Sequence, residues 1–180
     1  MRIIAGEKRG HTIHAPKGRD TRPTSDRVRE SVFNLVGPVD GAAVLDLYAG
    51  SGAYGLEALS RGADRAVFVE NDRDAVRAIE RNLDKLRLSG TVLRQDAVTT
   101  LATEAGKGRK YDLVLVDPPY DMYLDFQPQL ARYLPAVVAD NGLIVVETDV
   151  RIEPELPLTQ RTSRKYGQAR ITVYEPSRER

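Results

Sequence analysis

The chain has 180 residues, 41% of them apolar, which suits one α/β domain with a small extension and a core that needs no disulfides. It contains no cysteine, which excludes disulfides, thiolate-bound zinc or iron–sulfur centres, and enzymes that attack a pyrimidine ring with a catalytic thiolate. No segment has the composition of a signal peptide or the apolar length of a membrane span, so we expect a soluble, cytoplasmic protein.

The formal net charge of +1 conceals a division along the chain. Residues 1–29 carry a net charge of +5 and residues 160–180 one of +4, whereas the segment between them carries −8. Two basic ends on an acidic body favour a positive surface suited to a phosphate backbone. Charged termini that are merely solvated are the alternative interpretation.

Short elements precede the main repeat of strands and helices. Residues 2–15 are predicted to form a hairpin that turns at residues 6–10, and a loop rich in proline, glycine and charge follows it. Thr24 or Ser25 can cap a helix that ends at Gly37-Pro38, because its apolar residues repeat at helical spacing. We therefore divide the chain into an N-terminal extension, residues 1–37, and a main domain, residues 38–180.

From residue 42 onward, apolar strands alternate with helices. Strands are predicted at residues 43–47, 66–70, 91–94, 113–117 and 143–147, and a closing hairpin at residues 156–160 and 169–174. Helices are predicted after each of the first two strands, and again at residues 130–138. Continuous apolar strands separated by helices are typical of an α/β fold with a parallel sheet covered on both faces.

A glycine-rich turn follows the first core strand. Gly50, Gly52 and Gly55 match the dinucleotide fingerprint, although this pattern alone also fits a nicotinamide cofactor or a plain tight turn. Asp46, at the tip of the strand, would meet a pyrophosphate unfavourably, but it can accept a hydrogen bond from the ammonium group of an amino-acid ligand. Glu70, after the second strand, is placed to bind ribose hydroxyls.

Asp96, after the third strand, can accept from an adenine amino group. These features together predict S-adenosylmethionine, a nucleoside with an amino-acid tail, as the cofactor. The predicted cofactor-binding residues are Asp46, Tyr48, Gly50, Ser51, Gly52, Gly55, Glu70, Asn71, Asp96 and Ala97. For Tyr48, simple packing is an equally good interpretation.

The predicted catalytic motif, Asp117-Pro118-Pro119-Tyr120, ends the fourth core strand. An exocyclic amino nitrogen of a base is a poor nucleophile, because its lone pair is delocalised into the ring. The Asp117 carboxylate and the Pro118 carbonyl can accept hydrogen bonds from its two N–H groups and direct the lone pair at a methyl donor. The prolines fix φ, and Tyr120 offers a flat face for stacking. The motif predicts amino methylation of a nucleic-acid base, with Asp117 or water as the acceptor of the released proton.

These motifs resemble the RsmD-type family of bacterial 16S ribosomal RNA guanine-N2 methyltransferases, which act at guanine 966. The resemblance covers essentially the whole chain, and its most distinctive part is the segment Thr21-Arg22-Pro23-Thr24-Ser25-Asp26-Arg27-Val28-Arg29-Glu30, with Phe33-Asn34. The opening residues 1–6 and the closing Lys165-Tyr166-Gly167-Gln168 are also similar to the family's. Tyr120 stands where some relatives carry phenylalanine.

The resemblance implies a Rossmann-like class I S-adenosylmethionine-dependent methyltransferase sheet of seven strands with a reversed final strand. It also implies an N-terminal hairpin that helps to hold RNA, and a 16S ribosomal RNA substrate within a 30S subunit or assembly intermediate that carries ribosomal proteins. We expect a monomer with no metal site. The residues predicted to contact RNA are Arg9, Lys17, Arg19, Arg22, Thr24 and Arg27.

Three other functions fit parts of the sequence. An adenine-N6 methyltransferase would use the same Asp117 motif, but 180 residues leave no room for a separate DNA-recognition domain. An RNA-binding module with a vestigial cofactor fold would have no need for Asp46, Glu70 and the Asp117 motif together. A nicotinamide-dependent oxidoreductase would have no use for that motif.

Overall fold

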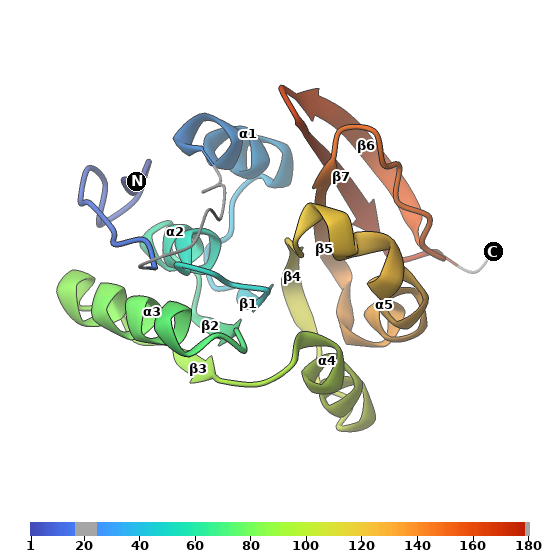
Figure 1. Ribbon diagram of the computed structural model, residues 1–180, viewed down its shortest axis with the longest axis horizontal. Coiled ribbons are helices and arrows are strands. Elements are labelled where there is room, and N and C mark those ends of the chain that lie inside the picture. The colour runs from blue at the N-terminus through green and yellow to red at the C-terminus, as the bar shows by residue number, and fades with distance from the viewer. Residues whose placement is uncertain (17–24, 179–180) are drawn as a thin grey trace.

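The computed structural model describes residues 1–16 and 25–178, which form one sheet with helices on both faces (Figure 1). The strands are β1 (Ala43–Leu47), β2 (Arg65–Val69), β3 (Thr91–Leu93), β4 (Tyr111–Val116), β5 (Val138–Asp149), β6 (Thr159–Tyr166) and β7 (Ala169–Glu175). The helices are α1 (Asp26–Val36), α2 (Ala53–Ser60), α3 (Arg73–Leu86), α4 (Ala97–Gly106) and α5 (Tyr123–Val137), and a 3-10 turn, η1 (Tyr120–Met122), precedes α5.

The sheet has seven strands in the order β3-β2-β1-β4-β5-β7-β6. Strands β1 to β5 pair in parallel, whereas β7 is antiparallel to both of its neighbours. This arrangement confirms the predicted fold, including the reversed final strand. In the central pair, Leu47 of β1 lies opposite Val116 of β4, so the segments that follow the two strands leave the sheet at the same level.

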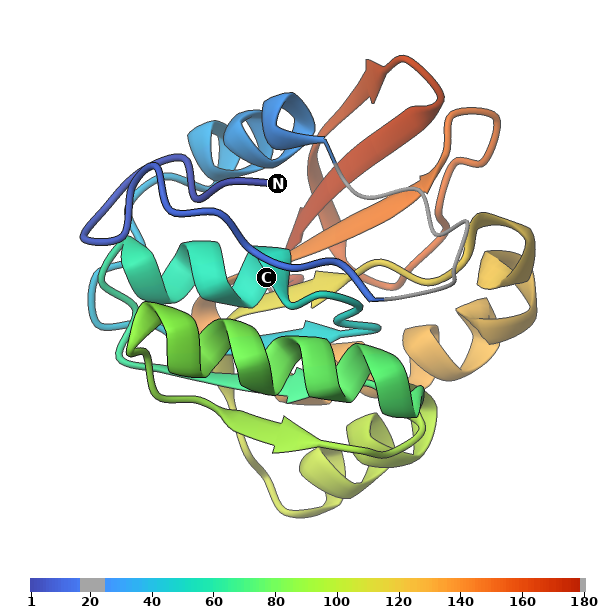
Figure 2. The ribbon, with the colours of Figure 1, turned by 60° about the vertical axis from the view of Figure 1, so that its left-hand side comes forward.

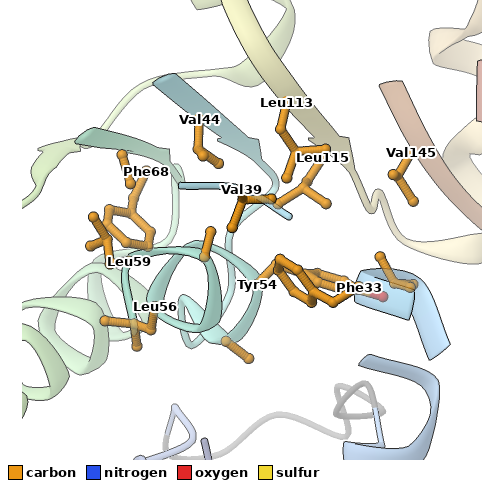
Figure 3. Close-up of a cluster of buried hydrophobic side chains, with 14 of the residues drawn as sticks. Phe33, Val39, Val44, Tyr54, Leu56, Leu59, Phe68, Leu113, Leu115 and Val145 are labelled. Carbon is orange, nitrogen blue, oxygen red and sulfur yellow. The ribbon is translucent and has the colours of Figure 1, made fainter. Parts of the chain in front are cut away.

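Both faces of the sheet are buried, as its continuous apolar strands predict. Val44 belongs to the core cluster beneath α1, α2 and α3, and its neighbour Leu45 belongs to the cluster on the α4 and α5 side. Figure 3 shows the first cluster, where Tyr54 of α2 lies beside Phe33 of α1, on the side of the sheet to which Leu113 and Leu115 of β4 point. The helices thereby hold the carboxyl ends of the central strands in fixed relation to one another.

The N-terminal segment packs across α2 and α3 (Figure 2). Its predicted hairpin is reduced to a single antiparallel bridge between Arg2 and Thr12, with a hydrogen bond from the Ile3 N–H to the His11 carbonyl (2.9 Å). Ile3 and Ile13 are buried in the same cluster as the sheet side chains. The extension therefore shares its core with the rest of the chain.

A buried carboxylate fastens this segment to α2. The two oxygens of Glu57 accept from the backbone N–H groups of Ile4 (2.8 Å) and Ala5 (3.1 Å). The same carboxylate forms ion pairs with Arg29 of α1 (3.2 Å) and with Arg61 (3.0 Å). A fully buried charge needs such partners, because an unpaired one costs several kcal/mol.

Some element boundaries differ from the sequence predictions. Helix α4 was not predicted, and α5 begins well before residue 130 although Pro128 and Pro135 lie inside it. Interior prolines usually end or kink helices, yet α5 continues through both of them. Strand β5 is longer than predicted. Strand β6 occupies residues 159–166 rather than 156–160, because this edge strand is polar and lacks an apolar pattern.

Across the described ranges, no helix combines the length and the apolar character needed to cross a bilayer.

Candidate active site at the carboxyl edge of the sheet

Glycine shapes the turn between β1 and α2. Gly50 and Gly52 have φ values of +58° and +81°, in the left-handed region, and Gly52 is the N-cap residue of α2. Gly55 has a different role, because a Cβ at this position would lie 2.3 Å from a ring carbon of Phe68. Its missing side chain lets α2 pack closely on β2. The predicted glycine motif thus forms a tight strand-to-helix turn that brings the N-terminus of α2 to the carboxyl edge.

Asp46 is buried beneath this turn, with 1% of its surface exposed. Its Oδ2 accepts a hydrogen bond from the Gly55 N–H (3.0 Å), so the carboxylate holds the first turn of α2. Burial raises the pKa of Asp46 to about 8; the Gly55 N–H opposes this shift, and the nearby charge of Glu70 adds to it. A cation at this edge would favour the ionised form, which suits the predicted role of Asp46 beside an ammonium group.

Glu70 follows β2 and joins two loops. Its Oε2 accepts from the Gly50 N–H (2.9 Å) and its Oε1 from the Asp72 N–H (3.0 Å). The carboxylate is 8% exposed and lies where the glycine turn meets the loop before α3. Its neighbour Asn71 is exposed. The structure therefore places the predicted ribose-binding residue directly against the glycine motif.

Asp96 is exposed and caps α4, since its Oδ2 accepts a hydrogen bond from the Thr99 N–H (2.8 Å). Ala97, the first residue of the helix, is buried.

Tyr48 has a left-handed φ of +58°, and its ring stacks on Phe126 of α5 at a centroid distance of 5.5 Å. Tyr48 therefore packs against a helix, as the alternative interpretation of this residue predicted. Its contact with a cofactor remains a prediction.

The Asp-Pro-Pro-Tyr motif follows β4. Asp117 is half-buried, Pro118 is buried and Pro119 is exposed, and the Pro119 carbonyl accepts from the Met122 N–H (3.0 Å) to close η1. The Tyr120 hydroxyl donates to Oε1 of Glu147 at 2.8 Å. Because β1 and β4 are neighbours that end at the same level, the glycine turn after β1 and Asp117 after β4 lie at the same edge of the sheet.

Sequence reasoning did not assign a role to Glu147. This carboxylate is 5% exposed and accepts from two hydroxyls, those of Tyr120 and of Tyr54 on α2 (3.0 Å). The pattern that singled out Asp46 and Asp117, an acidic residue at the carboxyl end of an apolar strand, also applies to Glu147. The sequence therefore indicated that Glu147 lies at this edge of the sheet, but it did not indicate that Tyr54 and Tyr120 bind it.

Asn82 is the second residue that sequence reasoning missed. It is fully buried on α3, its Nδ2 donates to the carbonyls of Ser51 (3.0 Å) and His14 (2.9 Å), and its Oδ1 accepts from the His14 N–H (2.7 Å). It therefore ties the N-terminal segment to the glycine turn. An asparagine on the apolar face of the predicted helix could have pointed to such a role.

The predicted RNA-contacting residues are only partly described. Arg9 and Arg27 are exposed, on the N-terminal segment and on α1. Lys17, Arg19, Arg22 and Thr24 lie outside the described residues. Ser25, the other candidate cap, is the N-cap of α1 and accepts from the Val28 N–H (3.1 Å).

The fold agrees with solved structures of methyltransferases. The 16S rRNA N2 methyltransferase RsmC of T. thermophilus, solved with AdoMet and guanosine, matches 88% of this chain and 45% of its own with a TM-score of 0.71 and 21% identity. Another Thermus protein, described as hypothetical, matches 97% of this chain and 99% of its own, with a TM-score of 0.83 and 32% identity. The chain has the Rossmann-like class I fold of S-adenosylmethionine-dependent methyltransferases.

Sequence comparison identifies the family within this class. A family model described as Conserved hypothetical protein 95 matches residues 1–175. The Escherichia coli (strain K12) protein named ribosomal RNA small subunit methyltransferase D is 39% identical over 158 residues, which cover 87% of this chain and 75% of that protein. The chain belongs to this RsmD-type family, as the resemblance of its motifs indicates.

Proposed function

We propose that this chain transfers a methyl group from S-adenosylmethionine to the exocyclic N2 amino group of a guanine in 16S ribosomal RNA. The observation that carries the proposal is the placement of the Asp117-Pro118-Pro119-Tyr120 motif beside the glycine turn, with Leu47 and Val116 paired at the ends of the two strands. The name of the Escherichia coli relative supports a small-subunit ribosomal RNA as the substrate.

The residues of the glycine turn suit the cofactor in charge and in shape. Asp46 and Glu70 place two carboxyl groups at the base of the turn, and the charge of Glu70 adds to the burial that raises the pKa of Asp46 to about 8. A ligand with an ammonium group would favour the ionised form of Asp46. Glu70 would bind the ribose hydroxyls and Asp96 the adenine amino group. S-adenosylmethionine, when bound, supplies an electrophilic methyl group.

The Asp117 motif would prepare the acceptor nitrogen. In this proposal the Asp117 carboxylate and the Pro118 carbonyl each accept a hydrogen bond from one amino N–H, which points the nitrogen lone pair out of the plane of the ring. Such preorganised acceptors stabilise the developing positive charge by about 3–4 kcal/mol each. The one proton released on methyl transfer passes to Asp117 or to water. Tyr120 stacks on the base, which contributes about 1–3 kcal/mol. The base must leave its own stack, or be exposed already, to reach this position.

The N-terminal extension, residues 1–37, would contact the RNA backbone. Of the residues predicted to do so, Arg9 and Arg27 lie in the described ranges and are exposed. The other four, Lys17, Arg19, Arg22 and Thr24, belong to the same proposal. Residues 38–180 would form the catalytic domain of a cytoplasmic monomer that docks onto a 30S subunit or assembly intermediate. If Arg9 and Arg27 contact phosphates, the variant with both replaced by Ala should bind RNA less tightly and with a salt slope about two units shallower. An unchanged slope would contradict these contacts.

The experiment that tests the proposed reaction is methyl transfer from labelled S-adenosylmethionine to small ribosomal subunits from cells that lack this enzyme, followed by nucleoside analysis. Label in N2-methylguanosine is expected, whereas label in N6-methyladenosine would replace guanine by adenine as the target. Asp117→Asn should lower kcat by about 100-fold or more with little change in cofactor affinity. Asp140→Asn, an exposed aspartate near the opposite end of β5, is the matched control and should retain wild-type activity.

A further inference from the structure

Glu147 joins the two loops that carry the proposed chemistry. Tyr54 is the second residue of α2, directly after the glycine turn, and Tyr120 is the last residue of the Asp117 motif. Their hydroxyls donate to the two different oxygens of the Glu147 carboxylate, at 3.0 Å and 2.8 Å. Glu147 itself lies on β5, one residue after Val146, which pairs with Val116 of β4. One side chain thus connects three neighbouring segments at the carboxyl edge.

The two tyrosines depend on this carboxylate to different degrees. The Tyr54 ring is buried and packs beside Phe33 at a centroid distance of 6.5 Å, so the core holds it in place. The Tyr120 ring is only half-buried and starts a short 3-10 turn, so its hydroxyl contact contributes more to fixing its orientation. Hydrogen bonds to a carboxylate are shorter and stronger than neutral ones, and burial at 5% exposure strengthens them further.

We propose that Glu147 is a positioning residue that fixes the plane of the Tyr120 ring relative to α2, and thereby sets the face on which the acceptor base stacks. The inference rests on the proposed function, because it assigns the stacking of the base to Tyr120. Glu147 acts through the Tyr120 hydroxyl and touches neither the base nor the methyl group. A phenylalanine at position 120 would keep the flat face but lose this anchor.

The kinetic test is a double-mutant cycle between Glu147→Ala and Tyr120→Phe, measured as single-turnover methyl transfer with saturating cofactor. Each single variant should lower the rate by about tenfold, and the double variant should be no slower than Glu147→Ala, since both changes remove the same contact. Multiplication of the two effects in the double variant would overturn the proposal. Cofactor affinity should change less than twofold in Tyr120→Phe.

Glu147→Gln separates position from charge. The glutamine can accept from one hydroxyl and donate to the other, so it should recover most of the rate that Glu147→Ala loses. A rate as low as that of Glu147→Ala would show that the charge acts directly, which contradicts a positioning role.

If Glu147→Ala fails to fold, as judged by circular dichroism, the same cycle is run with Tyr54→Phe in its place. Tyr54→Phe removes one of the two hydrogen bonds that hold Glu147. The decrease in rate that Tyr54→Phe causes should therefore disappear when Tyr120 is already Phe.

A matched control comes from the other end of β4. The Tyr111 hydroxyl donates to Glu104 at 2.6 Å, another tyrosine–glutamate bond that is buried, but it lies away from the glycine turn. Tyr111→Phe should leave the rate per folded molecule unchanged. A loss equal to that of Tyr120→Phe would mean that any buried tyrosine bond has this effect, and the proposal would fall.

A second readout needs no substrate. Hydrogen–deuterium exchange of the amides at residues 120–122 should become about tenfold faster in Glu147→Ala and in Tyr120→Phe, with no further increase in the double variant. Unchanged exchange in either single variant would overturn the positioning role. Failure of the wild-type protein to form N2-methylguanosine would instead overturn the proposed function, so the two failures are distinguishable.

Discussion

Affinity for S-adenosylmethionine should rise between pH 6 and pH 8, because Asp46 must be ionised to accept from an ammonium group. In the protein alone the pKa of Asp46 is raised to about 8, chiefly by burial. A bound cation favours the carboxylate and lowers that pKa, so binding releases a proton. The sign follows directly: acid conditions hold Asp46 in its neutral form and weaken binding.

The pKa also sets the magnitude of the effect. With a pKa of about 8, roughly one Asp46 in a hundred is ionised at pH 6 and about half are ionised at pH 8. The affinity should therefore increase on the order of 50-fold across this range, which corresponds to about 2 kcal/mol. Above pH 8 the increase should level off as the carboxyl group becomes fully ionised.

Isothermal titration calorimetry at pH 6, 7 and 8, in two buffers of different ionisation enthalpy, measures both the affinity and the number of protons released. Asp46→Asn is the matched variant, because its amide oxygen can still accept from the Gly55 N–H while the titrating proton is gone. The cofactor's own amino group titrates equally in both proteins, so the difference between them isolates Asp46. Equal pH slopes and equal proton release in the two proteins would refute the reasoning.

Two further predictions concern packing around the glycine turn. Gly55→Ala should lower the free energy of unfolding by about 1–3 kcal/mol in a urea titration, because its Cβ would lie 2.3 Å from Phe68. Gly106→Ala, whose Cβ meets nothing within 4 Å, should instead raise it by about 0.5–1 kcal/mol; destabilisation by both would contradict the packing argument. Asn82→Ala should cost about 2–4 kcal/mol, since it leaves the backbone groups of His14 and Ser51 without their partner. It should also speed proteolysis of the N-terminal segment, and an unchanged cleavage rate would count against the tie between that segment and the glycine turn.

The parts of the fold that follow from local patterns could be predicted from the sequence. Asp46 and Asp117 end apolar strands, and this placement alone put them at the carboxyl edge of a parallel sheet. The bounds of β6 were predicted wrongly, because this edge strand is polar and has no apolar run to mark it. The start of α5 was also missed, because the predicted helix begins at residue 130 and the observed one begins at Tyr123.

The connections within the site could not be predicted in the same way. The Tyr54–Glu147 bond joins residues 93 positions apart, and the Asn82–His14 bond joins residues 68 positions apart. Such pairings depend on the order of strands in the sheet and on how the helices pack, neither of which a local pattern specifies. The residue types were visible in the sequence, but their partners were not.

The position of β7 has a consequence for how the protein is made. This strand follows the other six strands in the chain, yet it inserts between β5 and β6. Until it is synthesised, the edge of β5 that carries Ile144, Val145 and Val146 has no neighbour on that side. An unpaired apolar edge is a template for aggregation. Substitutions that weaken β7 should therefore lower the yield of folded protein in the cell more than they lower the stability of the molecules that do fold.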